Sequence, residues 1–424
     1  MLDFNKVSRQ VSSIDHNTLS QAVGQRESEV QERKARLIEA RAALDLSMAQ
    51  PELFAERMVA NAPLVFWPLI MPYRQSAMMS RPIDAELMPW MAVAADGSQI
   101  MPSHHEVHDC YLLNAGMVRV AYGRKLNAMP AFAPFLNSEP ELFIAHDELN
   151  PLVQNRRVQV DEIYVSLERF LYELGHLLEQ ARISRSLSLS FSSEHRDAGA
   201  APAIVAFCDG SLIAWSAEKM PPIYFEHFQS RYLGLLEAFR EIGVPLISYV
   251  SRSRSVDLVN ALRVLVCPYQ SSDCRAHCGD LEESEFACST IWPTLDRQML
   301  DGRLAIGQTS HFYKSGAAQV NDMPPAQQIC FCYWNNGAEI ARLEMPAWVV
   351  DDDSALQMVL DACHSQVQKG QGYPVVLAEA HHLAVIKWPE RDAFFEYLAQ
   401  HMVGLGIAGV RVSDKERQKR SSFV

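Results

Sequence analysis

Two apolar runs that end on the same three residues constrain the fold of this 424-residue chain most strongly. Met91-Ala-Val-Ala-Ala leads into Asp96-Gly-Ser98, and Ala203-Ile-Val-Ala-Phe-Cys leads into Asp209-Gly-Ser211. An apolar run of about five or six residues closed by a Gly turn is typical of a central strand. We therefore expect two neighbouring strands that bring Asp96 and Asp209 to one edge of a sheet.

Two carboxylates at one sheet edge repel each other, and this repulsion points to a cation between them. Divalent metals with oxygen ligands are the usual means of holding such carboxylates together. A plainer alternative is that each Asp-Gly-Ser is only a turn, because Asp and Ser cap backbone amides and Gly adopts positive φ. The repetition after two wholly apolar runs favours a shared metal site.

A helix predicted between the two strands, over residues 161–182, offers a third carboxylate. Leu174 and Leu177 belong to its apolar stripe. Glu173 lies at the edge of this stripe, whereas Glu168 falls further onto the polar side. Because glutamates on helix surfaces are usually only solvated, Glu173 is the preferred candidate and Glu168 the alternative.

A histidine near the C-terminus is the next candidate. Tyr373 and Pro374 precede a helix predicted over residues 375–387, on which Leu377 and His381 share one face. This spacing predicts that His381 points inward among small apolar residues. An inward histidine is more often a hydrogen-bonded core residue than a catalyst. Beside a metal-carboxylate site it could instead bind the metal or move a proton, and Tyr373 could position a phosphate or the attacking water.

The order of predicted elements is three strands, a helix, a strand, a helix and a strand. It indicates an α/β or α+β core with a mixed sheet and flanking helices. We take the α/β class, which is the outline of a ribonuclease H-like fold. The first strands are predicted at 90–95, 110–114 and 116–122, and later ones at 203–208, 244–250, 328–334 and 339–344. A proline-rich connector is predicted from Met129 to Pro140 and a surface loop from Ser184 to Ala201.

Residues 1–85 are predicted to form an N-terminal helical extension, with an amphipathic helix from Glu27 to about Met48. Residues 86–424 are predicted to form one large domain, with an irregular, cysteine-rich insertion at about 267–325. No apolar run approaches the roughly 18 residues of a membrane span, and the N-terminus lacks a signal-peptide pattern. We therefore expect a cytoplasmic protein without membrane contact.

The formal net charge of −13 argues by itself against a nucleic-acid partner, because phosphates bind positive surfaces. A global sum does not describe a local field, however. Basic residues gather at Arg252 and Arg254 and again between Lys415 and Arg420. The plainer alternative is that they are solvated surface groups. If DNA is the substrate, we expect them to line a basic groove inside an acidic exterior.

The chain has nine cysteines and no secretion signal, so they should be mostly reduced. Four of them follow the spacing C-x6-C-x3-C-x9-C, namely Cys267, Cys274, Cys278 and Cys288. Such a cluster points to a metal rather than to disulfides. Because the spacing lacks a tight C-x2-C pair, a structural zinc ion, an iron–sulfur cluster and free thiols all stay open.

The chain resembles the NurA nucleases, which process DNA ends with a HerA-type hexameric ATPase. The residues that carry this resemblance are Ala92-Val-Ala-Ala-Asp96-Gly-Ser98, Asp209-Gly-Ser211-Leu, Arg342-Leu-Glu344-Met-Pro346 and Tyr373-Pro-x-x-Leu-x-x-Ala-His381 with Ala384-Val-Ile386. They follow one another in order from about residue 85 to the C-terminus. The resemblance implies a ribonuclease H-like fold and a ring-shaped homodimer. It also implies single-strand endonuclease and 5′–3′ exonuclease activity in double-strand break end resection.

The resemblance also implies roles for individual residues. The implied catalytic residues are Asp96, Glu173, Asp209, Tyr373 and His381, of which Asp96, Glu173, Asp209 and His381 would bind metal. Arg252 or Arg254 would contact DNA phosphates, at a place where relatives often carry a lysine. Oxygen ligands with one imidazole suit Mn²⁺ or Mg²⁺, and the resemblance favours Mn²⁺.

The expected function is therefore metal-assisted hydrolysis of a DNA phosphodiester, in which one ion activates water and a second steadies the leaving oxygen. The alternative is a non-catalytic DNA-binding or assembly subunit on the same fold. A third possibility, a phosphotransferase or ATPase on this fold, lacks the expected Gly-rich phosphate loop.

Overall fold

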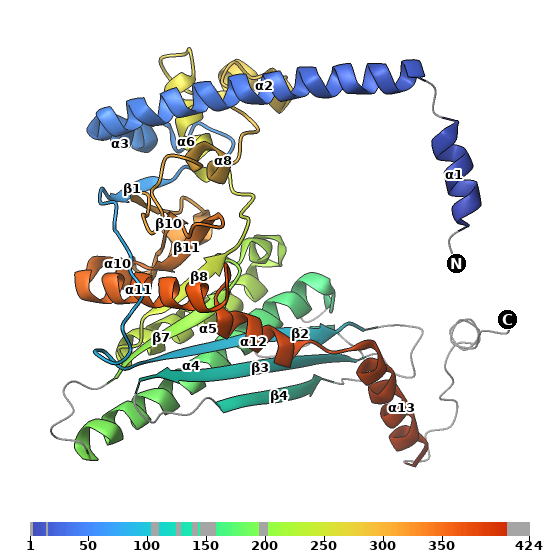
Figure 1. The fold of residues 1–424 in the computed structure, drawn as a ribbon, viewed down its shortest axis with the longest axis vertical. Coiled ribbons are helices and arrows are strands. Elements are labelled where there is room, and N and C mark those ends of the chain that lie inside the picture. Colours follow the sequence, from blue (N-terminus) through green and yellow to red (C-terminus); the bar gives the residue numbers. More distant parts are fainter. Residues whose placement is uncertain are drawn as a thin grey trace. The chain divides into compact units, whose positions relative to one another are not determined.

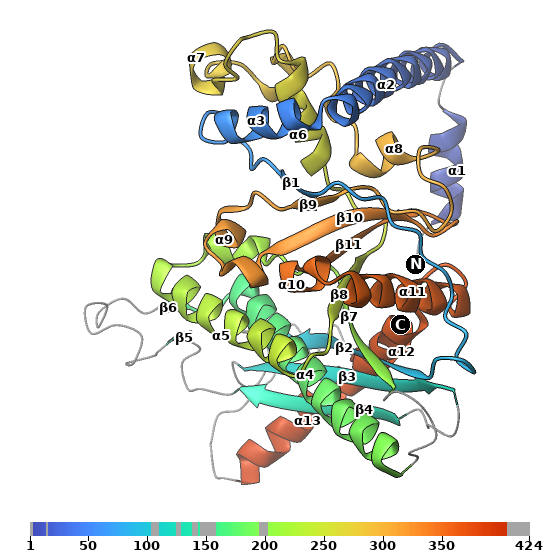
Figure 2. The ribbon, with the colours of Figure 1, turned by 90° about the vertical axis from the view of Figure 1, so that its left-hand side faces the viewer.

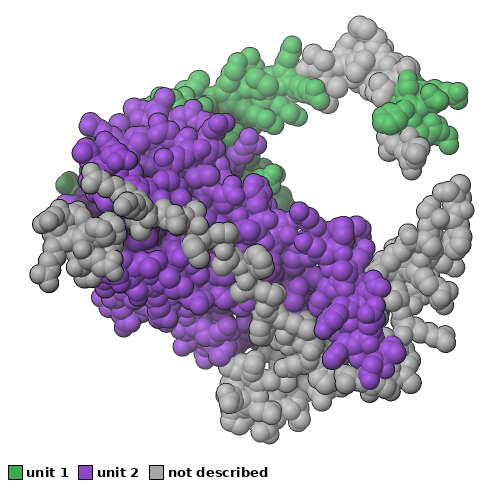
Figure 3. Space-filling model, turned by 60° about the horizontal axis from the view of Figure 1, so that its bottom comes forward, with its two compact units in different colours: residues 1–72, 253–304, 315–317 green, residues 73–252, 305–314, 318–424 purple. Residues whose placement is uncertain are grey.

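The computed structural model of the chain describes residues 3–13, 16–102, 110–123, 129–137, 143–144, 158–194 and 202–404 (Figure 1). These residues form two compact units (Figure 3). The smaller unit consists of Met1–Pro72, Ser253–Leu304 and Ser315–Ala317, and the larger unit contains the remaining segments. The units are defined by contacts within the fold, and the domain boundary predicted near residue 85 stays a prediction. None of the described helices has the length and apolarity that a membrane span requires.

The larger unit is built on one mixed sheet, to which nine of the described strands belong in the order β1-β9-β10-β11-β8-β7-β2-β3-β4. Their bounds are Met71–Arg74 for β1, Trp90–Ile100 for β2, Tyr111–Tyr122 for β3, Met129–Asn137 for β4, Ala203–Asp209 for β7, Leu246–Val250 for β8, Phe312–Lys314 for β9, Ile329–Asn335 for β10 and Ile340–Pro346 for β11. The short strands β5, Phe143–Ile144, and β6, Val158–Gln159, pair separately.

The centre of this sheet has the predicted mixed topology. Strands β2, β3 and β4 pair antiparallel in sequence order, β7 lies parallel to the other side of β2, and β8 lies parallel to β7. Strand β11 then runs antiparallel to β8. The predicted class, an α/β fold with a mixed sheet and flanking helices, is confirmed.

Helices cover both faces of the central strands. Their bounds in the larger unit are Glu162–Glu194 for α4, Pro222–Glu241 for α5, Ala318–Asn321 for α9, Ala347–Asp351 for α10, Asp353–Lys369 for α11, Val375–Ala384 for α12 and Trp388–Gly404 for α13. Helix α4 packs on β2, β3 and β7 with α5 beside it, and α12 crosses the other face of β2 and β3 (Figures 1 and 2). Residues 90–95 of β2 are consequently all buried, and a strand buried on both faces requires a continuous apolar run.

In the smaller unit, helices near the N-terminus pack against a much later segment. The helices are α1, Phe4–Ser12; α2, His16–Ala49; α3, Pro51–Asn61; α6, Asp257–Val266; α7, Cys274–Cys278; and α8, Asp296–Leu300. Helices α2 and α3 contact α6, and α2 also contacts α8. Arg41 Nε donates to the carbonyl of Met299 at 3.0 Å, and Arg303 forms a two-bond ion pair with Asp45.

Four local predictions were wrong. Strand β2 continues past Asp96 to Ile100, and β3 is one strand rather than two. The predicted connector from Met129 is strand β4, where prolines are tolerated because β4 is the last strand of the sheet. Helix α4 continues through residues 184–194, where a loop was predicted. Two of its serines bond back to the preceding turn: Ser186 donates to the Arg182 carbonyl and Ser190 to the Ser186 carbonyl.

Gly116 of β3 allows α12 to lie directly on the sheet. A Cβ atom at this position would be 2.5 Å from both the Ala380 carbonyl oxygen and the Ala384 nitrogen. Both are backbone atoms, so a side chain could be accommodated only by moving the helix. Gly175 of α4 differs, because a Cβ atom there would have no neighbour within 4 Å.

These two glycines predict opposite effects on stability. Gly116→Ala should lower the free energy of unfolding by about 1–3 kcal/mol through overpacking. Gly175→Ala should leave it unchanged or raise it by up to about 1 kcal/mol, because Ala favours helices. Urea unfolding followed by circular dichroism measures both. Equal midpoints for the two variants would contradict the close packing of α12 on β3.

Candidate active site

The structure brings Asp96 and Asp209 to the same place in the sheet. The parallel register of β2 and β7 ends with Ala95 opposite Cys208, so the two aspartates follow on adjacent strands. Strand β7 ends at Asp209, and Gly210 turns the chain away with a φ of +74° that favours glycine. Strand β2 continues in its pairing with β3. The edge is therefore a step at which one strand stops and its neighbour goes on.

His381 of α12 reaches Asp96 across this step. Its Nδ1 lies 2.7 Å from Oδ2 of Asp96, within hydrogen-bonding distance. The His381 side chain is 60% exposed, so the prediction that it points into the apolar core was wrong. Helix periodicity correctly placed it on the sheet side, but α12 ends soon afterwards and leaves this turn open to solvent.

The end of α12 is hydrogen-bonded to β2, which carries Asp96, and to the neighbouring strand β3. The hydroxyl of Ser98 and the side-chain amide of Asn114 both donate to the Ala384 carbonyl, the latter at 2.9 Å. Ala384 is the last residue of α12, less than one turn beyond His381. Ser98 and Asn114 therefore fix the height at which His381 meets Asp96. Ser98 could be recognised in the sequence as part of the Asp-Gly-Ser motif. No sequence pattern marked Asn114.

Tyr373 forms the equivalent contact with the second aspartate. Its hydroxyl donates to Oδ1 of Asp209 at 2.8 Å, and its ring packs edge-on against Tyr249. Burial raises the pKa of the Asp209 carboxyl, and the hydrogen bond from Tyr373 partly opposes that rise, whereas the charge of Asp96 adds to it. Each aspartate thus has one donor from the segment 373–381.

Glu173 approaches from the opposite face of the sheet, where α4 lies. A Cβ atom on Gly97 would be 2.3 Å from Oε1 of Glu173, so only glycine leaves room for this carboxylate beside β2. Arg169 forms an ion pair with Glu173 at 3.3 Å and donates to the Gly97 carbonyl. Burial raises the pKa of Glu173 to about 8; Arg169 opposes the rise, and the charges of Asp96 and Asp209 add to it.

Glu168, the alternative third carboxylate, has other partners. It accepts hydrogen bonds from the Tyr224 hydroxyl at 2.8 Å and from Arg231 at 2.8 and 3.1 Å. These contacts join α4 to α5. Of the two glutamates, Glu173 is the one that interacts electrostatically with both aspartates. We name Asp96, Glu173, Asp209, Tyr373 and His381 together the carboxylate cluster.

A buried ion pair that the sequence pattern did not assign holds the turn after Asp209. Glu344 of β11 accepts from Ser211 Oγ at 2.9 Å and from the Leu212 amide at 2.8 Å. Its other oxygen accepts from Arg342 Nε at 2.7 Å, and both side chains are buried. The alternation Arg342-Leu-Glu344 on one strand face was a signal for such a pair, but its partner Ser211 was not predictable.

The predicted DNA-contacting residues have different placements. Arg252 is exposed and lies just beyond β8, whose Tyr249 pairs with Asp209, so it follows the strand next to the cluster. Its amide donates to Glu339 at 2.7 Å in a turn with φ +46°. Arg254 belongs to the smaller unit. The basic run from Lys415 to Arg420 lies outside the described residues.

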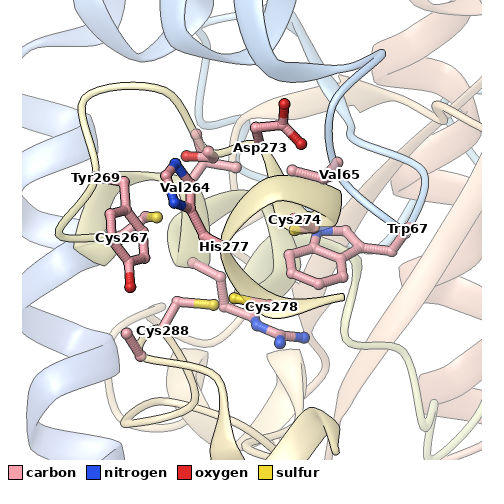
Figure 4. Close-up of a pocket in the computed structure, with 13 residues that line it drawn as sticks. Val65, Trp67, Val264, Cys267, Tyr269, Asp273, Cys274, His277, Cys278 and Cys288 are labelled. Carbon is pink, nitrogen blue, oxygen red and sulfur yellow. The ribbon is translucent and has the colours of Figure 1, made fainter. Parts of the chain in front are cut away.

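The four clustered cysteines line one pocket of the smaller unit (Figure 4). None of the nine cysteines of the chain forms a disulfide. No three His, Cys, Asp or Glu side chains in the described parts of the chain already stand close enough together to hold a metal ion. This applies both to the carboxylate cluster and to the cysteines, so metal binding would have to draw the ligands together.

The donor chemistry of the carboxylate cluster nevertheless fits a hard divalent cation. Three carboxylates and an imidazole supply oxygen and nitrogen ligands of the kind that Mn²⁺ and Mg²⁺ prefer. Oε1 of Glu173 is buried and accepts no hydrogen bond from the described residues, although Arg169 lies near it. A cation would satisfy this oxygen and relieve the repulsion that raises the pKa of Glu173.

The protein is a mixed α/β fold whose carboxylate cluster lies where the parallel strand β7 ends. Such a fold and site are suited to cation-dependent chemistry. The family model described as the NurA domain matches residues 92–386, and the chain belongs to this family. Among solved structures, it is similar to the crystal structure of the NurA nuclease from Sulfolobus solfataricus. That similarity has 11% identity and a TM-score of 0.41, and covers 92% of this chain and 98% of that one. A comparison with curated proteins gives no match.

The raised pKa of Glu173 predicts a pH dependence of stability in the presence of a chelator. The folded protein holds this carboxyl protonated up to about pH 8, whereas the unfolded chain ionises it near its ordinary value of 4.5. Stability should therefore fall as pH rises from 4.5 through 8. Glu173→Gln should remove this fall and be more stable than wild type at pH 9 by up to about 5 kcal/mol.

Urea midpoints measured between pH 5 and pH 9 test this prediction. Glu179→Gln is the matched control, because Glu179 is an exposed glutamate on the same helix. Its curve should follow wild type throughout. If wild type and Glu173→Gln changed in parallel, the buried position of the Glu173 carboxyl would be wrong.

Proposed function

We propose that this chain is a divalent-metal-dependent deoxyribonuclease whose active site is the carboxylate cluster. The observation that carries the proposal is the pairing of His381 with Asp96 and of Tyr373 with Asp209, on strands that are parallel neighbours. These four residues, from β2, β7 and the segment 373–381, converge there together with Glu173 of α4. Membership of the NurA domain family supports the same assignment.

The cluster offers the groups that phosphodiester hydrolysis requires. Divalent ions bound by Asp96, Glu173, Asp209 and His381 would supply an activated water and stabilise charge on the phosphate. The Asp96 carboxylate can only accept, so the pair fixes the His381 proton on Nδ1 and leaves the Nε2 lone pair free to take a proton or to bind a cation. Tyr373 keeps Asp209 oriented.

Arg252 is the group proposed to contact the DNA backbone. It is exposed, follows β8 at the edge where Asp209 lies, and belongs to the same unit. A guanidinium presents paired donors that match phosphate oxygens. Arg254 and the run from Lys415 to Arg420 are proposed as further phosphate contacts, because local positive charge is needed on a chain with net charge −13.

The finer functional assignment is also a proposal, and the family resemblance supports it. We propose single-strand endonuclease and 5′–3′ exonuclease activity, with Mn²⁺ preferred to Mg²⁺. The proposed setting is resection of double-strand break ends in the cytoplasm. The proposed partners are a HerA-type hexameric ATPase and a second copy of this chain.

Cleavage of labelled single-stranded DNA in Mn²⁺ tests the proposal. Asp96→Ala removes both a cation ligand and the partner of His381, so its rate should fall at least about 100-fold. Asp322→Asn is the matched control and should cleave like wild type. Asp322 is exposed and precedes β10, whose first residue pairs with Pro346 at the edge opposite Asp209.

Circular dichroism should show that both variants are folded. Equal cleavage by Asp96→Ala and wild type would place the nuclease activity outside this cluster. If the wild-type chain binds DNA but cleaves none, with Mn²⁺ or Mg²⁺ and with the ATPase present, the non-catalytic subunit becomes the better assignment.

A further inference from the structure

The four-cysteine pocket of the smaller unit is independent of the carboxylate cluster. Its sulfur atoms come from three pieces of chain. Cys267 follows the end of α6, Cys274 and Cys278 are one turn apart on α7, and Cys288 lies in a loop beyond Glu283. The side chains surround a common space (Figure 4). Cys274, Cys278 and Cys288 are buried, and Cys267 is half-buried.

A buried arginine in the wall of this pocket points to an anionic occupant. Arg263 is 0% exposed and lines the pocket. Its Nη1 donates to Glu283 at 2.6 Å, and its guanidinium stacks 3.8 Å from the Trp67 ring. Its Nε and Nη2 are buried and have no hydrogen-bond partner among the described residues. Unpaired guanidinium nitrogens are costly to bury unless negative charge lies nearby.

Backbone amides act on two of the thiols. Burial raises the pKa of Cys274 and Cys278, and the backbone N–H groups of Phe66 and Ala287 oppose that rise. Nearby N–H groups stabilise the negative charge of metal-bound sulfur. A bound cation would add to this stabilisation and overcome the cost of burial.

We propose that Cys267, Cys274, Cys278 and Cys288 hold a metal centre through four thiolates. A divalent ion with four thiolates carries a net charge of about −2, and the unpartnered Nε and Nη2 groups of Arg263 would donate hydrogen bonds to its sulfur atoms. The pocket has a volume of about 10 Å³, which leaves room for about one water molecule. This size favours one zinc ion over an iron–sulfur cluster. Binding would draw the sulfur atoms inward onto the ion.

The centre would have a structural role. The described part of segment 267–295 contains only short helices, and one of its attachments is the Cys274 amide, which donates to the Leu64 carbonyl at 3.0 Å. A metal with four ligands would join α7 and Cys288 to the end of α6. Structural zinc sites of this kind contribute directly to folding.

Metal analysis of the full chain, purified under reducing conditions without chelator, tests the proposal. About one zinc atom per chain is expected. Cys267→Ser and Cys288→Ser should each lower the zinc content at least tenfold. Cys363→Ala is the matched control, because Cys363 is a buried cysteine of α11 in the larger unit, and it should keep its zinc.

A second measurement covers variants that fold poorly. Wild-type protein stripped of metal and titrated with Co²⁺ should show strong thiolate-to-cobalt absorption, and Cys267→Ser should show a weaker, shifted spectrum. Iron with acid-labile sulfide would keep the four-cysteine centre and overturn the choice of zinc. No bound metal together with no thiolate–cobalt absorption would overturn the centre itself. Neither readout depends on nuclease activity.

Discussion

The arrangement at the sheet edge depends on holding three carboxylates close together where water is scarce. Mutual repulsion and burial both oppose this, and the raised pKa of Glu173 and Asp209 is the direct sign of that opposition. His381, Tyr373 and Arg169 each supply one compensating donor or positive charge. A site balanced in this way is prepared for a cation, because binding one would relieve the repulsion that the side chains only partly offset.

Two glycines make this arrangement sterically possible from opposite sides of the sheet. Gly116 lies directly opposite Asp96 and allows α12 to touch β3, while Gly97 points to the other face and admits the carboxylate of Glu173. Successive residues of a strand face opposite ways. Asp96 and Gly97 therefore act together. Asp96 presents its carboxylate to α12, and Gly97 leaves space for the Glu173 carboxylate of α4.

Local patterns in the sequence were sufficient for most of the central strands, for the main helices and for the sheet edge that Asp96 and Asp209 share. The apolar runs before Asp96 and Asp209 predicted adjacent strands, because burial on both faces leaves a distinctive composition; the structure shows that these strands are parallel. Features that depend on distant partners were not predictable. The 60% exposure of His381 depends on what covers the end of α12, and the role of Glu344 depends on β11 pairing beside β8. Serine-rich residues 184–194 resembled a loop, because their helical packing against the rest of the unit leaves no local signal.

The smaller unit has a consequence for how the chain is made. Its helices α2 and α3 pack against α6, but α6 lies about 200 residues later in the sequence, after most of the central sheet. At usual elongation rates the ribosome needs roughly 10–40 s to produce the intervening segment. During that interval the apolar side of α2 and α3 has no native partner. Helices α2 and α3 are thus synthesised well before α6 allows them to complete their packing.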